Sequence, residues 1–99
     1  MTPYTPGPKD APGSCGIGAD DSQDVVAISH VYFKGKNGNG NPHCGKKVRV
    51  KYHGKTVELK IIDLCNACGE HDLDIAIKPF QKLSGVKDGK HGGVNWEFL

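Results

Sequence analysis

The residues best suited to chemistry lie together in the stretch IIDLCNACGEHDLDIAIKPF, residues 61 to 80. This stretch contains Cys65 and Cys68 in a C-x-x-C spacing, one histidine and four acidic residues. Three kinds of site use such residues: half of a zinc site, the ends of disulfides, or a carboxyl pair that exchanges protons during hydrolysis. The composition of the whole chain helps to decide between them.

The composition indicates a small domain that is rich in turns. The chain has 99 residues, of which 14 are Gly and 6 are Pro, and only 7% are aromatic. A chain of this length folds as one domain that buries about 65% of its unfolded surface, which leaves little margin for stability. The Gly and Pro content disfavours a helical bundle. We therefore expect a single monomeric domain that is held together by more than its hydrophobic core.

The charge and hydropathy exclude two classes of partner. Thirteen Lys and Arg against eleven Asp and Glu give a net charge of +2, which is too small and too evenly mixed for a nucleic-acid-binding protein. No apolar run approaches the roughly 20 residues that cross a bilayer, so we expect no membrane partner. The N-terminus lacks the apolar segment of a signal peptide. We expect a mature start from which any export signal has been removed.

The cysteines favour a secreted protein. Cys15, Cys44, Cys65 and Cys68 make an even number in a small chain rich in Gly and Pro, which is typical of extracellular domains held by disulfides. Three pairings are possible. A bond between Cys65 and Cys68 closes a very tight ring, whereas bonds to Cys15 and Cys44 close long loops and stabilise by about 3–4 kcal/mol each. The predicted pairing is therefore Cys44–Cys65 with Cys15–Cys68.

Zinc is the alternative use of the same cysteines. The sequence offers ligands for a tetrahedral site at Cys65, Cys68, His71, His43 and Cys44. However, a single C-x-x-C without a second ligand pair at regular spacing is a weak signal. We therefore predict disulfides, with no metal and no other cofactor.

The hydrophobic pattern predicts short strands joined by turns. We expect residues 1–14 to be an irregular Pro/Gly-rich segment and residues 15–99 to form the folded domain. The predicted elements are a strand within 24–33, a flexible loop at 34–43, a hairpin within 46–63 that turns at 53–55, a strand that leads into a helix at 78–83, and a closing strand within 92–99. Together they indicate a mainly β barrel with one helical turn.

Several segments resemble the double-psi β-barrel of the expansin, loosenin, barwin and rare lipoprotein A-like group. The resemblance runs from about Tyr4 to the end of the chain, and its most specific parts are IIDLCNAC, LDIAIKPF and GVNWEF. It implies a small six-stranded double-psi β-barrel with one or two short helical turns. It also implies secretion, and cysteines in disulfides rather than in a zinc site.

The same resemblance implies a groove. Asp63 and Asp74 fall on the two acidic positions that line the expansin groove, and Thr5 falls on its threonine. Tyr4 is a further groove candidate. Because expansin-like proteins generally lack a partner for the groove acid, the resemblance implies binding or loosening of cell-wall polysaccharide without hydrolysis, and no enzyme. The alternative is that Asp63 and Asp74 only accept hydrogen bonds from loop N–H groups.

The aromatic residues bear on polysaccharide binding, since sugars stack on exposed coplanar rings. The periodicity of the strands assigns four of them to the core, namely Tyr52, Phe80, Trp96 and Phe98. The others, Tyr4, Tyr32 and Phe33, would make only a thin platform. This shortage lowers the expectation of a polysaccharide-binding protein.

The N-terminal TPYTPGPKDAPGSCG joined to such a barrel resembles secreted bacterial inhibitors of papain-type cysteine proteases. A rigid disulfide-bonded scaffold loses little entropy when its loops enter a protease cleft. We therefore predict a non-catalytic inhibitor of a papain-type cysteine protease, with cell-wall polysaccharide binding as the alternative. The inhibitory-loop candidates are Lys36, Asn37, Asn39, Asn41 and His43, or else the N-terminal Pro/Gly segment.

The remaining polar residues are assigned to the surface. The five histidines have unrelated spacings, and they form no Ser/His/Asp or Cys/His arrangement with the other residues. Most of the lysines are predicted to form a solvated face. Gln23 and Gln81, together with exposed lysines, are candidate sites for crosslinking by a transglutaminase.

Overall fold

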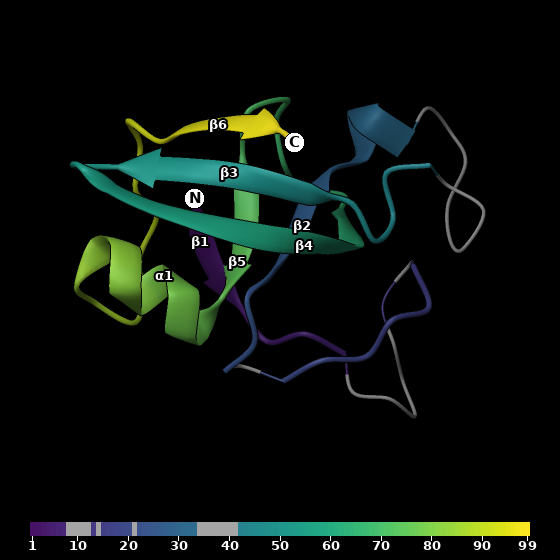
Figure 1. The fold of residues 1–99 in the computed structure, drawn as a ribbon, viewed down its shortest axis with the longest axis horizontal. Coiled ribbons are helices and arrows are strands. Elements are labelled where there is room, and N and C mark those ends of the chain that lie inside the picture. Colours follow the sequence, from purple (N-terminus) through teal and green to yellow (C-terminus); the bar gives the residue numbers. More distant parts are fainter. Residues whose placement is uncertain (8–12, 14, 21, 34–41) are drawn as a thin grey trace.

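A computed structural model describes residues 1–7, 13, 15–20, 22–33 and 42–99 of the chain. Its elements are the strands β1 (Thr2–Tyr4), β2 (Val25–Ser29), β3 (Lys47–Tyr52), β4 (Lys55–Cys65), β5 (Leu73–Ala76) and β6 (Asn95–Phe98), the 3-10 helix η1 (His30–Phe33) and the helix α1 (Ile77–Ser84) (Figure 1). The predicted mainly β fold with six strands and short helical turns is confirmed. Among the described residues, no helix is long and apolar enough to cross a membrane.

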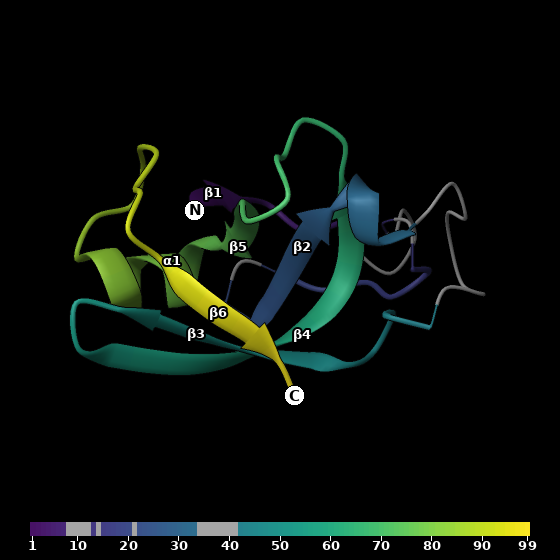
Figure 2. The same cartoon turned by 90° about the horizontal axis from the view of Figure 1, so that it is seen from above.

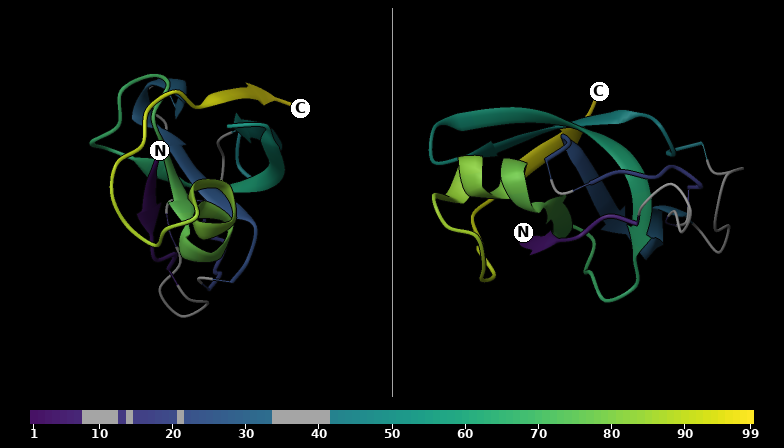
Figure 3. Two further views of the ribbon diagram at one scale, coloured as in Figure 1. Left: turned by 90° about the vertical axis from the view of Figure 1, so that its left-hand side faces the viewer. Right: turned by 90° about the horizontal axis from the view of Figure 1, so that it is seen from below.

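The six strands form one sheet in the order β1-β5-β2-β4-β3-β6. The pairs β1–β5 and β2–β4 are parallel, and the other three pairs are antiparallel. The sheet curls around the core, as Figures 2 and 3 show. Helix α1 contacts β1, β3, β4 and β5, so that it covers one end of the curled sheet. Because β1 and β6 are the outermost strands in this order, the N-terminal and C-terminal strands form the two opposite edges of the sheet.

The central strand β2 is buried along its whole length between β4 and β5. A strand that is covered on both faces is expected to be continuously apolar, and VVAIS is apolar except for its last residue. The largest fully buried side chains are Phe80, Ile28, Leu59, Ile61, Ile62, Leu73, Ile75, Leu83, Val26, Val48 and Val50. They form the core that holds the functional residues in place.

The hairpin of β3 and β4 agrees with the prediction from sequence. Val48 and Val50 are buried on β3, while the lysines that alternate with them are exposed. Tyr52 pairs with Lys55, which leaves a two-residue loop. Both loop residues, His53 and Gly54, have positive φ angles of 48° and 81°. Two residues with positive φ make the hairpin turn whose twist matches that of the strands.

Helix α1 was also predicted, and it extends the predicted range by one residue at each end. Pro79 lies in the first turn, where a missing backbone N–H is tolerated. Gly85 ends the helix with a φ of 81°, and its N–H donates to the carbonyl of Gln81. Phe80 and Leu83 are buried, so the helix is anchored to the core by its apolar side.

The expectation that residues 1–14 are irregular is wrong for Thr2–Tyr4. These residues form β1, which pairs in parallel with β5. The Pro content of the segment suggested an irregular chain, but β1 is an edge strand. Proline is tolerated there because one side of an edge strand forms no ladder hydrogen bonds. The N-terminal strand is therefore part of the barrel.

The predicted disulfide pairing is also wrong. The observed bonds are Cys15–Cys44 and Cys65–Cys68, with Cα–Cα distances of 5.5 and 5.4 Å. The loop-length argument concerns the unfolded chain, whereas pairing depends on which cysteines the fold brings together. Cys15 N–H donates to the carbonyl of Ile62, and the N–H of Gly45 donates to the carbonyl of Ile61. Both halves of the long-range bond are thus attached to the middle of β4.

Candidate functional site

The sheet register brings the predicted groove aspartates onto one face. Ala27 on β2 is the register partner of Asp63 on β4 and of Asp74 on β5, and Asp74 is also the partner of Thr2 on β1. Register partners point their side chains to the same face of a sheet. Strand spacing places the two aspartate Cα atoms about 10 Å apart, with only the small Ala27 between them. We call Thr2, Asp74, Ala27 and Asp63 the polar row.

Thr2 is the threonine that contacts the polar row. Its hydroxyl donates a hydrogen bond to Oδ1 of Asp74. Thr5, which the family resemblance placed in the groove, is exposed just beyond the end of β1. The sequence carried a signal for Thr2, since Thr2 and Tyr4 are two residues apart and side chains at that spacing share one face of a strand.

Tyr4 brings an unpaired hydroxyl to the same face. The hydroxyl oxygen is buried and has no hydrogen-bond partner among the described residues. Burial raises the pKa of Tyr4 well above its usual range, and the negative charges of Asp63 and Asp74 raise it further. The phenol therefore remains protonated next to both carboxylates, so it is a hydrogen-bond donor and not a base.

Asp63 is held by the backbone around it. One carboxylate oxygen accepts a hydrogen bond from the N–H of Leu64 at 2.8 Å. A Cβ atom built on Gly13 would lie 2.3 Å from the other oxygen, so the chain at Gly13 packs directly on the carboxylate. Asp63 is half-buried beneath this segment. This arrangement suits a structural carboxylate better than a general acid that must reach a substrate.

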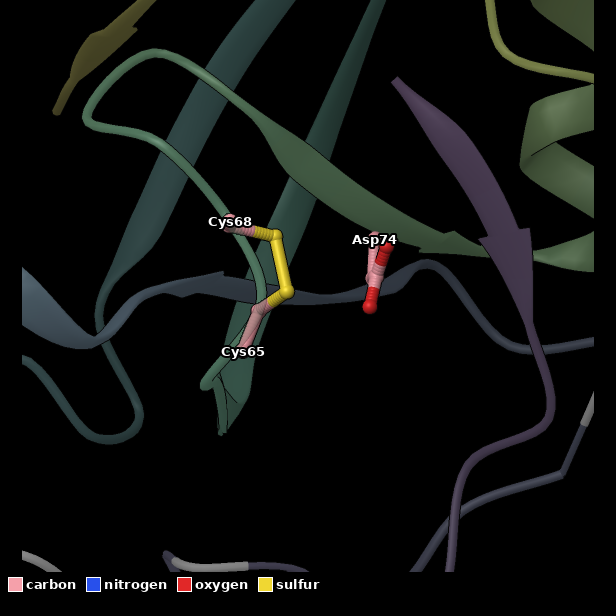
Figure 4. A group of neighbouring side chains, drawn as sticks. All are labelled: Cys65, Cys68 and Asp74. Atoms are coloured by element: carbon pink, nitrogen blue, oxygen red, sulfur yellow. A yellow bond between two sulfur atoms is a disulfide. The ribbon is translucent and has the colours of Figure 1, made fainter.

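Beside the polar row lies a pocket of about 160 Å³ that contains the Cys65–Cys68 disulfide. Asp74 lines the pocket from β5, and Figure 4 shows its carboxylate next to the two sulfur atoms. The only group of three or more His, Cys, Asp or Glu ligand atoms close together in the described part of the chain is Cys65, Cys68 and Asp74. Of the zinc ligands considered from sequence, only Cys65 and Cys68 belong to this group, whereas His71, His43 and Cys44 do not.

A second candidate site lies around the C-terminal strand. Tyr32, His43, Trp96 and Phe98, which we call the aromatic surface, pack against one another. The ring of Phe98 stacks on His43 at 4.9 Å between centroids and meets the edges of Tyr32 and Trp96 at 5.2 and 5.1 Å. The indole N–H of Trp96 donates to the carbonyl of His71 at 2.9 Å. The rings are therefore fixed in position.

The aromatic surface is open to solvent. Phe98 is 39% exposed, and the neighbouring apolar residues Val31 and Leu99 are 44% and 52% exposed. The periodicity of the strand predicts that Phe98 and Trp96 lie in the core. This prediction is wrong for Phe98, whereas Trp96 is partly buried and packs against the core. The reason is that β6 is an edge strand, so no further strand covers its outer side.

The other predicted site residues have mixed outcomes. His43 belongs to the aromatic surface, whereas Lys36, Asn37, Asn39 and Asn41 lie outside the described residues. The two crosslinking candidates, Gln23 and Gln81, are both exposed. Among the residues assigned to the core, Phe80 is fully buried and Tyr52 is half-buried.

Sequence comparison finds relatives, although no protein-family model matches the chain. The chain is 35% identical over 89 residues to the papain inhibitor of Streptomyces mobaraensis, covering 88% of this chain and 62% of that protein. It is also 34% identical over 101 residues to the Allergen Asp f 7 homolog of Arthroderma benhamiae, covering 88% of this chain and 35% of that protein. The chain thus spans less than two thirds of the length of these curated relatives.

Comparison with solved structures gives the same relationship. The Streptomyces papain inhibitor superposes with a TM-score of 0.87 at 35% identity, covering 100% of this chain and 89% of that chain. The expansin of Clavibacter michiganensis superposes with a TM-score of 0.72 at 23% identity, covering 99% of this chain and 47% of that chain. The expansin likeness concerns the fold alone. The chain belongs to the family of the Streptomyces papain inhibitor, which is built on an expansin-like double-psi β-barrel.

Proposed function

We propose that this protein binds and inhibits a papain-type cysteine protease and turns over no substrate. The observation that carries this proposal is the relationship to the Streptomyces papain inhibitor, at 35% identity and a TM-score of 0.87 over the whole chain. The fold alone does not decide function, because one scaffold serves many activities. The surfaces of this chain must therefore support the proposal.

The aromatic surface supports it. Buried aromatic anchors supply most of the energy at protein interfaces, and rings that are already fixed lose little entropy on binding. Phe98 is exposed, and it is held by His43 and Trp96. The Cys15–Cys44 disulfide fixes the chain next to His43. We propose the aromatic surface as part of the protease contact, together with the candidate residues at 36–43.

The polar row supports the absence of turnover. Asp74 already accepts the Thr2 hydroxyl, and Asp63 lies under Gly13. A hydrolase of polysaccharides needs one carboxyl to donate a proton and a second to activate water or attack the sugar. Asp74 lines the pocket beside the Cys65–Cys68 disulfide but Asp63 does not, so these two carboxyls do not face one common cavity. The protein therefore acts by occupying a cleft and not by catalysis.

Two other predictions extend this proposal. The disulfides Cys15–Cys44 and Cys65–Cys68 support secretion, because such bonds persist in oxidising compartments.

The exposed Gln23 and Gln81 support crosslinking by a transglutaminase. Incorporation of a fluorescent primary amine in the presence of a transglutaminase would test this, and loss of labelling in Q23N or Q81N would identify the acceptor.

Titration of papain with the oxidised protein tests the proposed function. We expect stoichiometric loss of peptidase activity. Replacing Phe98 with Ala should raise the inhibition constant about 30-fold, since truncation of an interface anchor costs about 2 kcal/mol. The matched control is Val86→Ala, which removes an apolar side chain of similar exposure, 44%, from the segment that follows α1. This variant should inhibit like the unmodified protein.

A pull-down on insoluble cellulose, chitin and peptidoglycan separates the alternative function. Retention on a polymer with papain unaffected would overturn the inhibitor proposal. Loss of that retention in the D63N/D74N variant would then assign polysaccharide binding to the polar row. If the protein inhibits papain, the D63N/D74N variant should inhibit as well as the unmodified protein.

A further inference from the structure

We propose that Cys65, Cys68 and Asp74 form a binding site for a thiophilic divalent metal ion such as Zn²⁺ once the Cys65–Cys68 disulfide has been reduced. One ligand atom from each of these residues lies within 4.8 Å of the others. Cys65 ends β4, Cys68 follows in the next turn, and Asp74 comes from β5 (Figure 4). None of these three residues belongs to the aromatic surface.

The ligand types fit a zinc site with three protein ligands. Zinc is bound by thiolate sulfur and carboxylate oxygen in tetrahedral sites, and C-x-x-C is a common spacing for two of the ligands. The three protein ligands leave one position for water or another small ligand. The pocket of about 160 Å³ that these residues line gives space for it. The sulfur atoms are shielded from bulk solvent, since Cys65 and Cys68 are only 7% and 8% exposed.

Contacts outside the disulfide hold all three residues in place. Cys65 is the register partner of Ser29 in the parallel pair β2–β4. The buried Ser29 hydroxyl donates to the carbonyl of Cys68 at 3.1 Å, which fixes the turn after β4. The Thr2 hydroxyl donates to Asp74 and orients its carboxylate. Outer hydrogen bonds of this kind position metal ligands in proteins. The three residues therefore stay together when the sulfur–sulfur bond opens.

Reduction and metal binding are separate steps with a simple balance. A phosphine reductant and water supply two electrons and two protons, so that the disulfide becomes two thiols and the phosphine becomes its oxide. The metal ion then displaces the two thiol protons and binds two thiolates and the Asp74 carboxylate. Three negative ligand charges face one divalent cation. Asp72 lines the same pocket and adds to the excess negative charge, whereas Lys90 and the Met1 ammonium oppose it. Metal binding should therefore release protons and strengthen as the pH rises.

Anaerobic titration of the phosphine-reduced, desalted protein with Co²⁺ tests the site. We expect one equivalent to bind, with the near-ultraviolet absorption of thiolate-to-cobalt charge transfer and the visible bands of a tetrahedral ion. Zn²⁺ should remove both signals by displacement. The variant Asp74→Asn should weaken binding at least about tenfold, as loss of even an orienting group does. The control Asp72→Asn removes a negative charge that lines the pocket outside the ligand group but keeps a side-chain oxygen that can accept from the Gly69 N–H, so it should weaken binding much less than Asp74→Asn does.

Protection from alkylation locates the ligands without a cysteine variant. In the reduced protein, Zn²⁺ should protect Cys65 and Cys68 from iodoacetamide and leave the reactivity of Cys15 and Cys44 unchanged. Absence of the cobalt signal in a reduced protein that remains folded would overturn the proposal. If reduction unfolds the protein, failure of Zn²⁺ to restore the native circular dichroism would overturn it as well. Protection of Cys15 and Cys44 instead would also overturn it. Because papain inhibition is measured on the oxidised protein, failure of this site leaves the proposed function intact.

Discussion

Thr2 and Asp74 are joined twice: they are register partners in the parallel pair β1–β5, and the Thr2 hydroxyl donates a hydrogen bond to the Asp74 carboxylate. The two residues are 72 positions apart in the sequence. The side-chain bond thus connects an edge strand of three residues to the strand that carries one of the groove candidates. We expect this bond to contribute to the stability of the N-terminal strand.

Replacing Thr2 with Val tests that contribution. Valine keeps the shape of threonine but leaves the half-buried carboxylate without its donor. The free energy of unfolding in urea should fall by about 1.5–3 kcal/mol, the usual contribution of a hydrogen bond to a charged group. Thr5→Val is the control, because Thr5 is exposed and its replacement should change stability by less than about 0.5 kcal/mol. Equal effects of the two variants would contradict the assignment of Thr2.

The raised pKa of Tyr4 predicts that the protein loses stability in alkaline solution. Burial, aided by Asp63 and Asp74, raises the pKa of its hydroxyl in the folded protein above the ordinary value of 10.0. The folded state therefore holds this proton more tightly than the unfolded state. Its contribution to stability is complete below pH 10 and is lost as the pH rises above that value.

The variant Tyr4→Phe isolates this effect. Urea unfolding between pH about 8 and about 11 should show a steeper loss of stability in the unmodified protein than in Y4F. At neutral pH the variant should be as stable as the unmodified protein or more stable by about 1 kcal/mol, because it removes a buried hydroxyl that has no partner. Parallel curves for the two proteins would contradict the prediction, because they would mean that folding does not raise the pKa of Tyr4.

The two disulfides should differ in their effect on stability. Cys15–Cys44 joins residues separated by 29 positions, and Cys65–Cys68 joins residues separated by 3. Chain entropy assigns about 3–4 kcal/mol to the longer loop and about 2 kcal/mol to the shorter one. We expect C15A/C44A to lower the unfolding free energy more than C65A/C68A does, as measured by chemical denaturation. The opposite order would mean that packing around Cys65 and Cys68 outweighs loop closure.

Gly13 and Asp63 should be energetically coupled. An Ala Cβ at position 13 would meet the Asp63 carboxylate at 2.3 Å, so Gly13→Ala must displace that side chain. We expect a loss of about 1–3 kcal/mol in stability, as for other substitutions that overpack a tight contact. In the D63A background the same substitution should cost much less. A double-mutant cycle measures the coupling, and strict additivity would contradict the contact.

The sequence predicts those parts of the fold that are determined by residues close together along the chain. The hairpin of β3 and β4 follows from alternating apolar residues around His53–Gly54, and α1 follows from its apolar spacing and the glycine at its end. The disulfide pairing could not be predicted in this way. It depends on how β4 lies between the segments around Cys15 and Cys44, which no local pattern specifies.

Only part of the candidate site could be predicted from sequence, because the rest depends on the order and pairing of the strands. The family resemblance identified Asp63 and Asp74, and the register of β2 places them on one face. It also placed the groove threonine at position 5, whereas Thr2 is the residue that bonds Asp74. The exposure of Phe98 was missed because a strand at the edge of a sheet has the same apolar alternation as a central one. Strand order must be known before an alternating residue is assigned to the core.

The pairing of β1 with β5 has a consequence for how the chain reaches its folded state. Residues 2–4 cannot be paired until residues 74–76 are available, and β2 likewise waits for β4. Contacts this distant in sequence slow folding, because a large loop must close before they form. A chain leaving the ribosome thus cannot complete its sheet until most of it has been synthesised.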